Sequence, residues 1–259
     1  IDPSKPDFAG EVTITGTLDR RSAVIWLNAS ELAIASATAT NGAAPVTLTA
    51  TPHGEYLELR PAQPLDAGTW TLHLAYRGHI EQNAYQGAFV SKQGDDRYVT
   101  TQFESTAARM VFPCFDEPDV KVPWQLALDV PKDLVAVSNT PIASTTPVDA
   151  AHVRVEFAKT RPLPSYLIAF AVGPYEIVDA GHAKSGLPLR IVVPRGKAKA
   201  AAYVAGAMPK IVDTLEAWFA IPYPYPKLDI VVVPSARGLA MENAGMITAD
   251  ARYTLLDHP

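Results

Sequence analysis

The sequence predicts a mainly β protein, in which an antiparallel β-sandwich or saddle-shaped sheet comes first and the start of a mixed α/β unit follows. Three observations predict this class. Many short segments before residue 181 alternate apolar and polar residues, and no helical pattern separates them. After residue 181, one amphipathic helical pattern leads into a short, strongly apolar strand.

Eight short segments between residues 11 and 177 carry the strand pattern. In the first of them Val12 and Ile14 would face a core while Thr13 and Thr15 face water, as in a strand with one buried face. The segments are EVTITGTL (11–18), SAVIWLN (22–28), PVTLTATP (45–52), EYLELRP (55–61), GTWTLHLAYRGHI (68–80), WQLALDVP (124–131), HVRVEFAKT (152–160) and YLIAFAVGPYEI (166–177). Because no helix stands between them, we expect antiparallel pairing.

A helix and two further strands are expected in the last third of the chain. Residues 197–220 place apolar side chains three to four positions apart, and Pro209 should kink or interrupt that helix near Met208. A buried strand at 228–234, a loop at 235–238 and a neighbouring strand at 239–248 follow. We therefore expect an amino-terminal antiparallel β domain (1–186) and the first part of a second domain (187–259).

Composition excludes several classes of function. With 48% hydrophobic and 19% charged residues, and no apolar run near the roughly 20 residues of a membrane span, the chain reads as a soluble globular protein. A net charge of −5 without a basic block argues against a nucleic-acid partner. The single cysteine, Cys114, excludes an internal disulfide, and we interpret it as a small buried residue rather than a nucleophile.

The two ends of the sequence look cut. The first residues, IDPSKPDFAG, show no basic start followed by an apolar core, so no signal peptide is visible. The last residues, LLDHP, carry no terminating feature. We therefore expect a fragment of a longer protein, whose compartment stays open with a slight preference for the cytoplasm.

Four segments, in order along the chain, carry a family resemblance. LAMEN (239–243), followed by AGMIT, resembles the Gly-x-Met-Glu-Asn exopeptidase motif of the aminopeptidase N family of zinc peptidases. TQFESTAARMVFPCFDEP (101–118), VPKDLVAVSNTP (130–141) and IPYPYPKLDIVVVP (221–234) are similar to that family's segments in the same order. The resemblance covers almost the whole chain, and it implies that residues 187–259 begin a thermolysin-like catalytic domain.

Glu242 lies inside an apolar run, so its carboxylate needs a partner if the segment packs as a strand. A buried Arg or Lys would be a structural partner. The resemblance implies a different one, because the family's motif Glu binds the free α-ammonium of a peptide while the adjacent strand pairs with the peptide backbone. It implies a second acid at Glu104. The implied substrate-binding residues are Gln102, Glu104, Ala240, Met241, Glu242 and Asn243.

The physical demand on such a site is clear without the family. An exopeptidase must recognise a cation at a fixed distance from the scissile carbonyl, and a carboxylate does this with a charge-assisted hydrogen bond. Two close carboxylates repel each other until one ammonium relieves them, which favours charged ligands. We therefore expect peptides with a free N-terminus as partners.

The resemblance also implies a Zn²⁺ ion in the full-length enzyme, held by a His-Glu-x-x-His helix and a second Glu roughly 20 residues later. The six histidines form no such pair; they are His53, His73, His79, His152, His182 and His258. We expect no catalytic residue and no metal ligand in this chain, and we expect the ligands to lie beyond residue 259. The remaining catalytic and C-terminal domains of the parent protein are then further partners.

Two departures from the family pattern and two alternative functions stay open. The motif usually opens with Gly where this chain has Leu239, and Gly238 could supply the freedom of a glycine instead; Ala244 stands where many relatives carry an aromatic residue. Arg109 could pair with Asp116 or Glu117. The alternatives are a non-catalytic family member that acts as a protein-interaction scaffold, and an all-β adhesion or carbohydrate-binding module.

Overall fold

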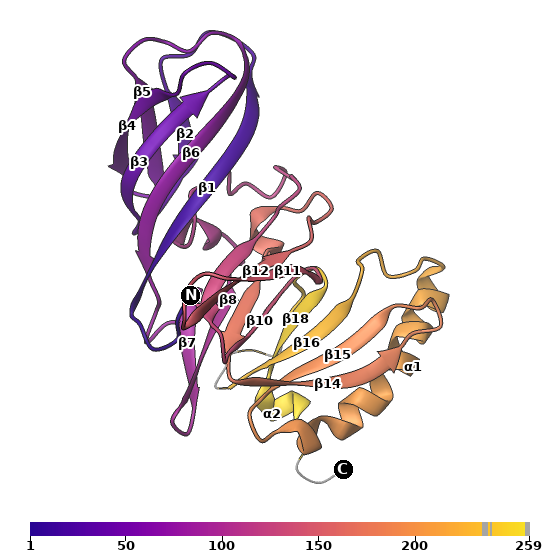
Figure 1. Cartoon of the computed structure of the whole chain (residues 1–259). Helices are drawn as coiled ribbons and strands as arrows, with labels where there is room; N and C mark the ends of the chain where they lie inside the picture. The colour runs from indigo at the N-terminus through magenta and orange to yellow at the C-terminus, as the bar shows by residue number, and fades with distance from the viewer. Residues whose placement is uncertain (235–237, 239, 257–259) are drawn as a thin grey trace.

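The computed structural model describes residues 1–234, 238 and 240–256, which form four β-sheets and two α-helices (Figure 1). In Figure 1 a six-stranded sheet forms an elongated lobe at the amino-terminal end of the molecule. Two smaller sheets lie in the middle, and a five-stranded sheet with the longer helix across one face lies at the opposite end. The mainly β class predicted from the alternating segments is therefore confirmed.

The six-stranded sheet is wholly antiparallel, with strand order β1-β6-β3-β4-β5-β2. Its strands are β1 (Asp7–Leu18), β2 (Ile25–Asn28), β3 (Ala33–Thr40), β4 (Val46–His53), β5 (Tyr56–Pro61) and β6 (Gly68–His79). Trp70, Leu72 and Leu74 of β6 are buried while the residues between them are more exposed, which is the expected period of two. These side chains meet Leu57 and Leu59 in one apolar core.

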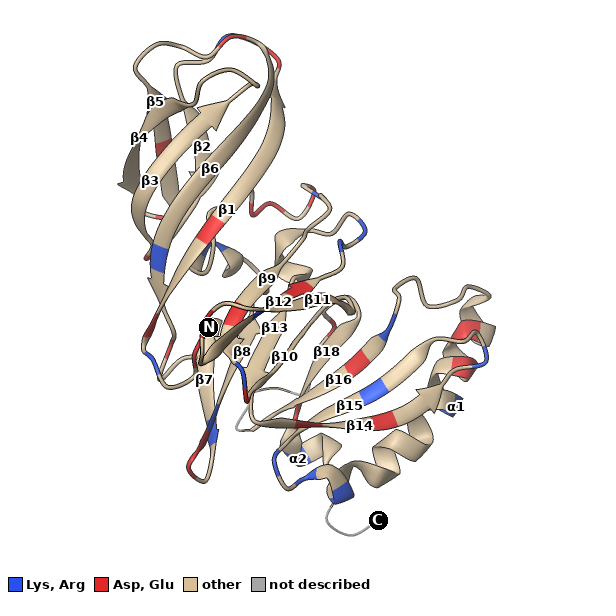
Figure 2. Cartoon of the chain, viewed as in Figure 1, with Lys and Arg blue, Asp and Glu red and all other residues tan. Residues whose placement is uncertain are grey.

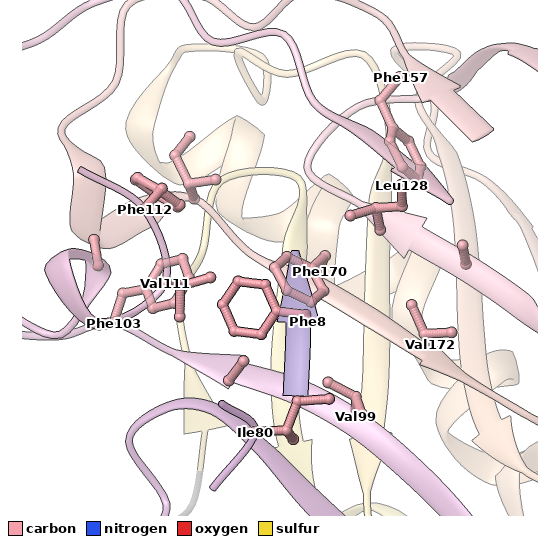
Figure 3. Packing of buried hydrophobic residues seen from close by; sticks show 14 of the residues in the cluster. Phe8, Ile80, Val99, Phe103, Val111, Phe112, Leu128, Phe157, Phe170 and Val172 are labelled. Atoms are coloured by element: carbon pink, nitrogen blue, oxygen red, sulfur yellow. The ribbon is translucent and has the colours of Figure 1, made fainter. Parts of the chain in front are cut away.

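The middle of the molecule holds a four-stranded sheet, ordered β10-β13-β8-β7, and a three-stranded sheet, ordered β11-β12-β9. The strands are β7 (Gly87–Gln93), β8 (Asp96–Gln102), β9 (Ala127–Pro131), β10 (Val135–Ser138), β11 (Ile142–Pro147), β12 (His152–Phe157) and β13 (Phe170–Gly173). Two 3₁₀ turns, Ala108–Met110 and Ser165–Leu167, connect them. Aromatic and aliphatic side chains from both sheets and from Phe8 of β1 share one core (Figure 3).

The five-stranded sheet has the order β14-β15-β16-β18-β17. Its strands are β14 (Tyr175–His182), β15 (Pro188–Pro194), β16 (Leu228–Val233), β17 (Ala240–Met241) and β18 (Met246–Asp250). The central strands β15, β16 and β18 run parallel, and β14 and β17 pair antiparallel at the two edges. The strand expected at 239–248 is therefore two strands, because the chain turns at Ala244 and Gly245 and Gly245 has φ +73°.

Helix α1 (Ala202–Phe219) packs on this sheet and runs through Pro209 without a break. The expected interruption near Met208 is therefore wrong. Ala205, Met208 and Val212 are buried in one apolar cluster with residues of the five-stranded sheet, so packing stabilises the helix on both sides of Pro209. This burial offsets the backbone hydrogen bond that proline cannot make. A 3₁₀ turn (Ala198–Ala201) precedes α1, and the short α2 (Ala251–Thr254) follows β18.

The sheets change at a different point from the expected domain boundary. Residues 186 and 187 lie in the β14–β15 hairpin, so β14 shares a sheet with the residues after it. The four-stranded and five-stranded sheets also share a core, to which Tyr98 and Val137 contribute from one side and Val192 and Met246 from the other. Tyr175 is the first residue of the five-stranded sheet.

Charged residues of both signs are interspersed over the described chain (Figure 2). None of the helices within the described residues is both long and apolar enough to cross a membrane.

Candidate functional site

A pocket of about 280 Å³ lies where the middle of the molecule meets the five-stranded sheet. Gln102 and Glu104 line it from the end of β8, and Ala240 and Met241 line it from β17. The fold thus brings together four of the six residues that the family resemblance implies. The other lining residues are Tyr85, Phe89, Thr100, Thr101, Val233, Gly238, Thr248, Ala249 and Asp250.

Buried neighbours fix the end of β8. The Thr101 hydroxyl donates to the Phe170 carbonyl at 3.3 Å and accepts from the Phe170 amide at 3.0 Å. Phe103 is fully buried in the core of the middle sheets. Phe103 is held in this core, and the residues on either side of it, Gln102 and Glu104, line the pocket. Gln102 is half-buried and Glu104 is exposed.

Strand β17 forms an edge of the five-stranded sheet. Ala240 pairs with Ala249 and Met241 with Thr248, both on β18. The Met241 side chain is buried, whereas Ala240 is exposed. Among the described residues no strand pairs with the other side of β17, so its outer backbone groups can accept a partner.

Glu242 follows β17 directly, and its side chain is exposed. The chain leaves β17 at this residue, so the Glu242 carboxylate is not packed within a strand. No described residue forms a hydrogen bond or ion pair with the Glu242 or Glu104 carboxylate. Neither acid is thus neutralised by a Lys or Arg in the described part of the chain; Arg237, like Ser235, Ala236 and Leu239, lies outside it.

Asn243 is almost completely buried, beside Glu242. Its carbonyl accepts from the Met246 amide at 3.0 Å, and its side-chain Nδ2 has no hydrogen-bond partner among the described residues. Neither Glu242 nor Asn243 lines the pocket itself. Gly238, which precedes β17 in the sequence, has φ +129°, a conformation that glycine adopts more readily than other residues.

Asp250 also lines the pocket, but its charge is already paired. The carboxylate accepts from Arg252 Nε at 3.1 Å and from the Arg252 amide at 2.8 Å, so it also caps α2. The hydrogen bond from the Arg252 side chain lowers the pKa of Asp250 below its usual range. Asp250 therefore differs from Glu104, which lines the same pocket without such a partner.

One group of described residues could hold a metal ion, and it lies outside the pocket lining. It consists of Glu31, His79 and Glu81, and His79 Nε2 lies 2.6 Å from Glu81 Oε1 and 3.3 Å from Glu31 Oε2. The predicted substrate-binding residues themselves include no imidazole or thiolate. They therefore do not fit a zinc ion with nitrogen ligands.

Residues of the FPCFDEP segment (112–118) make structural contacts. Arg109 Nε donates to Asp116 Oδ2 at 2.9 Å, which settles the pairing in favour of Asp116 over Glu117, and Arg109 Nη1 reaches Glu55 at 3.1 Å. Cys114 is buried, and this burial raises the pKa of its thiol well above the usual range. Such a thiol is a poor nucleophile.

The sequence analysis did not predict a set of buried polar residues beside the turn at Ala244 and Gly245. Asn139, Lys227 and Asp229 are each almost fully buried, and Arg190 pairs with Asp229. The only signal in the sequence is KLD at 227–229, a charged pair at the start of an apolar strand, which a globular protein buries only when both charges are paired.

Comparison with known proteins gives two family matches, which cover different parts of the chain. Residues 1–167 match the Peptidase M1 N-terminal domain, and residues 203–259 match the Peptidase family M1 domain. The chain is 31% identical over 96% of its length to aminopeptidase M1-D of Oryza sativa subsp. japonica. It is 39% identical over 67% of its length to the puromycin-sensitive aminopeptidase of Caenorhabditis elegans.

The length of these relatives differs from that of the chain. The chain spans 29% of the rice protein and 18% of the nematode protein. It spans 72% of aminopeptidase N from Acetobacter pasteurianus, to which it is 33% identical over 97% of its own length. Both matched models and these aminopeptidase relatives lead to one conclusion: the chain belongs to the M1 family of peptidases.

Proposed function

We propose that this chain is the amino-terminal part of a zinc-dependent aminopeptidase, and that its pocket receives the free N-terminus of a peptide. One observation carries the proposal. Gln102 and Glu104 lie far from Ala240 and Met241 in the sequence, yet all four line one pocket. Membership of the M1 family supports the same function.

Glu104 and Glu242 are the proposed binding groups for the α-ammonium. Both carboxylates are exposed and unpaired among the described residues, so none of the described Lys or Arg side chains competes there with a substrate cation. Water and salt weaken attraction between exposed charges. The attraction strengthens when the bound peptide displaces water from the pocket, because charge-assisted hydrogen bonds gain strength as the surroundings dry.

Strand β17 is the proposed binding edge for the peptide backbone. Its outer side has no strand partner in the described part of the chain, so an extended peptide can add to the sheet there. The backbone of Ala240 and Met241 would then hold the first peptide unit in register, and Asn243 follows directly. Backbone pairing would fix the distance between the ammonium and the scissile carbonyl.

Zinc would polarise the scissile carbonyl and lower the pKa of the attacking water. The described pocket residues do not fit a zinc ion, so we propose that its ligands lie beyond residue 259. This chain contributes the recognition of the substrate end, and no step of bond cleavage is assigned to its residues.

Substitution of Glu242 in the longer parent protein tests the proposal. We expect Glu242→Gln to lower kcat/KM for a free N-terminal substrate about 10- to 100-fold, because the charge is lost while the shape stays. Asp19→Asn, an exposed acid outside the pocket lining, is the matched control and should leave kcat/KM unchanged. The measurement is steady-state hydrolysis of an aminoacyl anilide, with thermal stability recorded for each variant.

Two results would overturn the assignment. A Glu242→Gln protein that loses thermal stability but keeps its preference for free over N-acetylated substrates would make Glu242 a structural residue. A parent sequence that lacks the His-Glu-x-x-His pattern would favour the non-catalytic scaffold.

A further inference from the structure

The turn at Ala244 and Gly245 connects the segment that carries Glu242 to strand β18. It is packed so closely that a Cβ on Gly245 would lie 2.2 Å from the carbonyl oxygen of Asn139. Gly245 also has φ +73°. No side chain fits at this position, so the backbone itself is in contact with its surroundings.

Polar groups from distant parts of the chain bind the backbone of this turn. Asn139 Nδ2 donates to the Ala244 carbonyl at 2.8 Å, and Lys227 Nζ donates to the Gly245 carbonyl at 2.8 Å. The Gly245 amide donates to Tyr223 Oη at 3.0 Å. Three side chains therefore satisfy the turn just after Glu242 and Asn243, and these three side chains are called the turn clamp.

Asn139 connects the turn to the sheet that carries the other half of the pocket. Its Oδ1 accepts from the Ala169 amide at 2.9 Å, and its Nδ2 donates to the Leu167 carbonyl at 2.8 Å. Ala169 precedes β13, which pairs with β8, the strand that ends at Gln102. The amide of Asn139 thus joins the segment before β13 to the Ala244 carbonyl.

Lys227 connects the same turn to the five-stranded sheet. Its ammonium is buried and lies 2.8 Å from Asp229 Oδ2, and Arg190 makes two further bonds to Asp229 at 2.8 and 2.7 Å. Desolvation lowers the pKa of Lys227, while the adjacent Asp229 opposes that shift. Removing an ion from water costs free energy, and leaving a buried ion unpaired costs more. The Lys227 ammonium therefore stays beside Asp229 and the Gly245 carbonyl.

We propose that Asn139 and Lys227 are positioning residues for the ammonium site, because they fix the turn that sets the distance between Glu242 and the Gln102–Glu104 segment. The inference rests on the proposed function, in which Glu242 and Glu104 share one ammonium. Two carboxylates can share it only when their separation is held to within about 0.5 Å. The turn clamp would hold this separation, because Asn139 also bonds to the segment before β13 and Lys227 also pairs with Asp229 of the five-stranded sheet.

The test measures ligand affinity in the longer parent protein. L-leucinamide presents an α-ammonium, and acetohydroxamate, which has none, binds through the metal. In Lys227→Met we expect the inhibition constant of leucinamide to rise about tenfold and that of acetohydroxamate to stay within twofold. Lys210→Met, an exposed lysine on α1, is the matched control and should change neither constant.

A milder variant keeps the test valid if Lys227→Met does not fold. Tyr223→Phe removes only the acceptor of the Gly245 amide, and we expect the leucinamide constant to rise about two- to fivefold. Asn139→Ala should act in the same direction as Lys227→Met. Equal affinity for leucinamide in folded Tyr223→Phe and in the unchanged protein, or an equal loss for both ligands in any of these variants, would overturn the inference.

A double-mutant cycle separates positioning from general stability and from failure of the proposed function. If Lys227 acts through the placement of Glu242, Lys227→Met should weaken leucinamide binding much less in a Glu242→Gln background. Full additivity would mean that Lys227 does not act through Glu242. If Glu242→Gln alone leaves leucinamide binding unchanged, the proposed ammonium site is wrong, whatever Lys227 does.

Discussion

Gly245 shows how strongly one residue can be constrained near the proposed site. Its positive φ alone would tolerate a small side chain at a moderate cost, as at many turns. The Asn139 carbonyl, 2.2 Å from the place where a Cβ would stand, removes that tolerance. The site therefore depends on a residue without a side chain, which no charge or polarity pattern in the sequence could reveal.

A pair of glycine substitutions tests this constraint. Gly54 has φ +63° with open space around its Cβ position, whereas Gly245 has φ +73° and the close contact. We expect Gly54→Ala to lower the free energy of unfolding by about 1 kcal/mol and Gly245→Ala by about 3 kcal/mol or more. Urea unfolding measures both. Equal losses would show that the turn can move away from Asn139, which would also weaken the case for the turn clamp.

At the scale of elements, strands with strong contrast were predictable and strands without it were not. β5 and β6 alternate large apolar residues with polar ones, and the sequence predicts both. β3 alternates Ala with Ser and Thr, so its two faces hardly differ in hydrophobicity. β7 is buried at its first five residues, which removes the alternation that marks a strand with one wet face.

The site divides in the same way. The residues from the family-like segments could be identified, because Gln102, Glu104 and Glu242 stand inside recognisable runs of sequence. Asn139 and Lys227 of the turn clamp also stand inside family-like segments, but their proposed role could not be identified there because it depends on contacts across the fold. The exposure of Glu242 was also unpredictable, since it depends on the chain leaving β17 after two residues.

Helix α1 offers a test of how packing overrides a helix breaker. Since α1 is continuous through Pro209, alanine there should restore a backbone donor and remove the ring without changing the buried face. We expect Pro209→Ala to raise the free energy of unfolding by about 1 to 2 kcal/mol, after allowance for the greater freedom of the unfolded chain. Pro222→Ala, in the segment after the helix, is the control and should give no gain. A loss of stability in Pro209→Ala would mean that the helix needs the proline's shape.

At the scale of the whole molecule, the candidate pocket depends on two sheets that share a core. Tyr98 of β8 and Val137 of β10 pack with Val192 of β15 and Met246 of β18. β8 carries Gln102, and β18 pairs with the strand that carries Met241. The shared core therefore holds the two halves of the pocket together, and cutting the chain between the sheets should separate them.

Two truncated chains test where the second unit begins. Residues 1–173 end after β13, and residues 1–186 add β14 without its partner β15. We expect both to unfold cooperatively, because two of the apolar cores lie almost wholly before residue 174. We expect both to be less stable than the whole chain, since each loses the shared core.

Hydrogen exchange then distinguishes the two boundaries. Pro194 has no amide to donate to Tyr175, so the alternation of the antiparallel β14–β15 ladder directs the amides of Glu176 and Val178 to β15. In the whole chain these two amides should exchange slowly. In residues 1–186 we expect these amides to exchange at rates near those of an unfolded peptide, because an isolated strand has no partner for its backbone. Amides in β8, such as Val99, should stay protected in both truncated chains and serve as the internal control. Protection of Glu176 and Val178 in residues 1–186 would place β14 with the amino-terminal domain and support a boundary at residue 186.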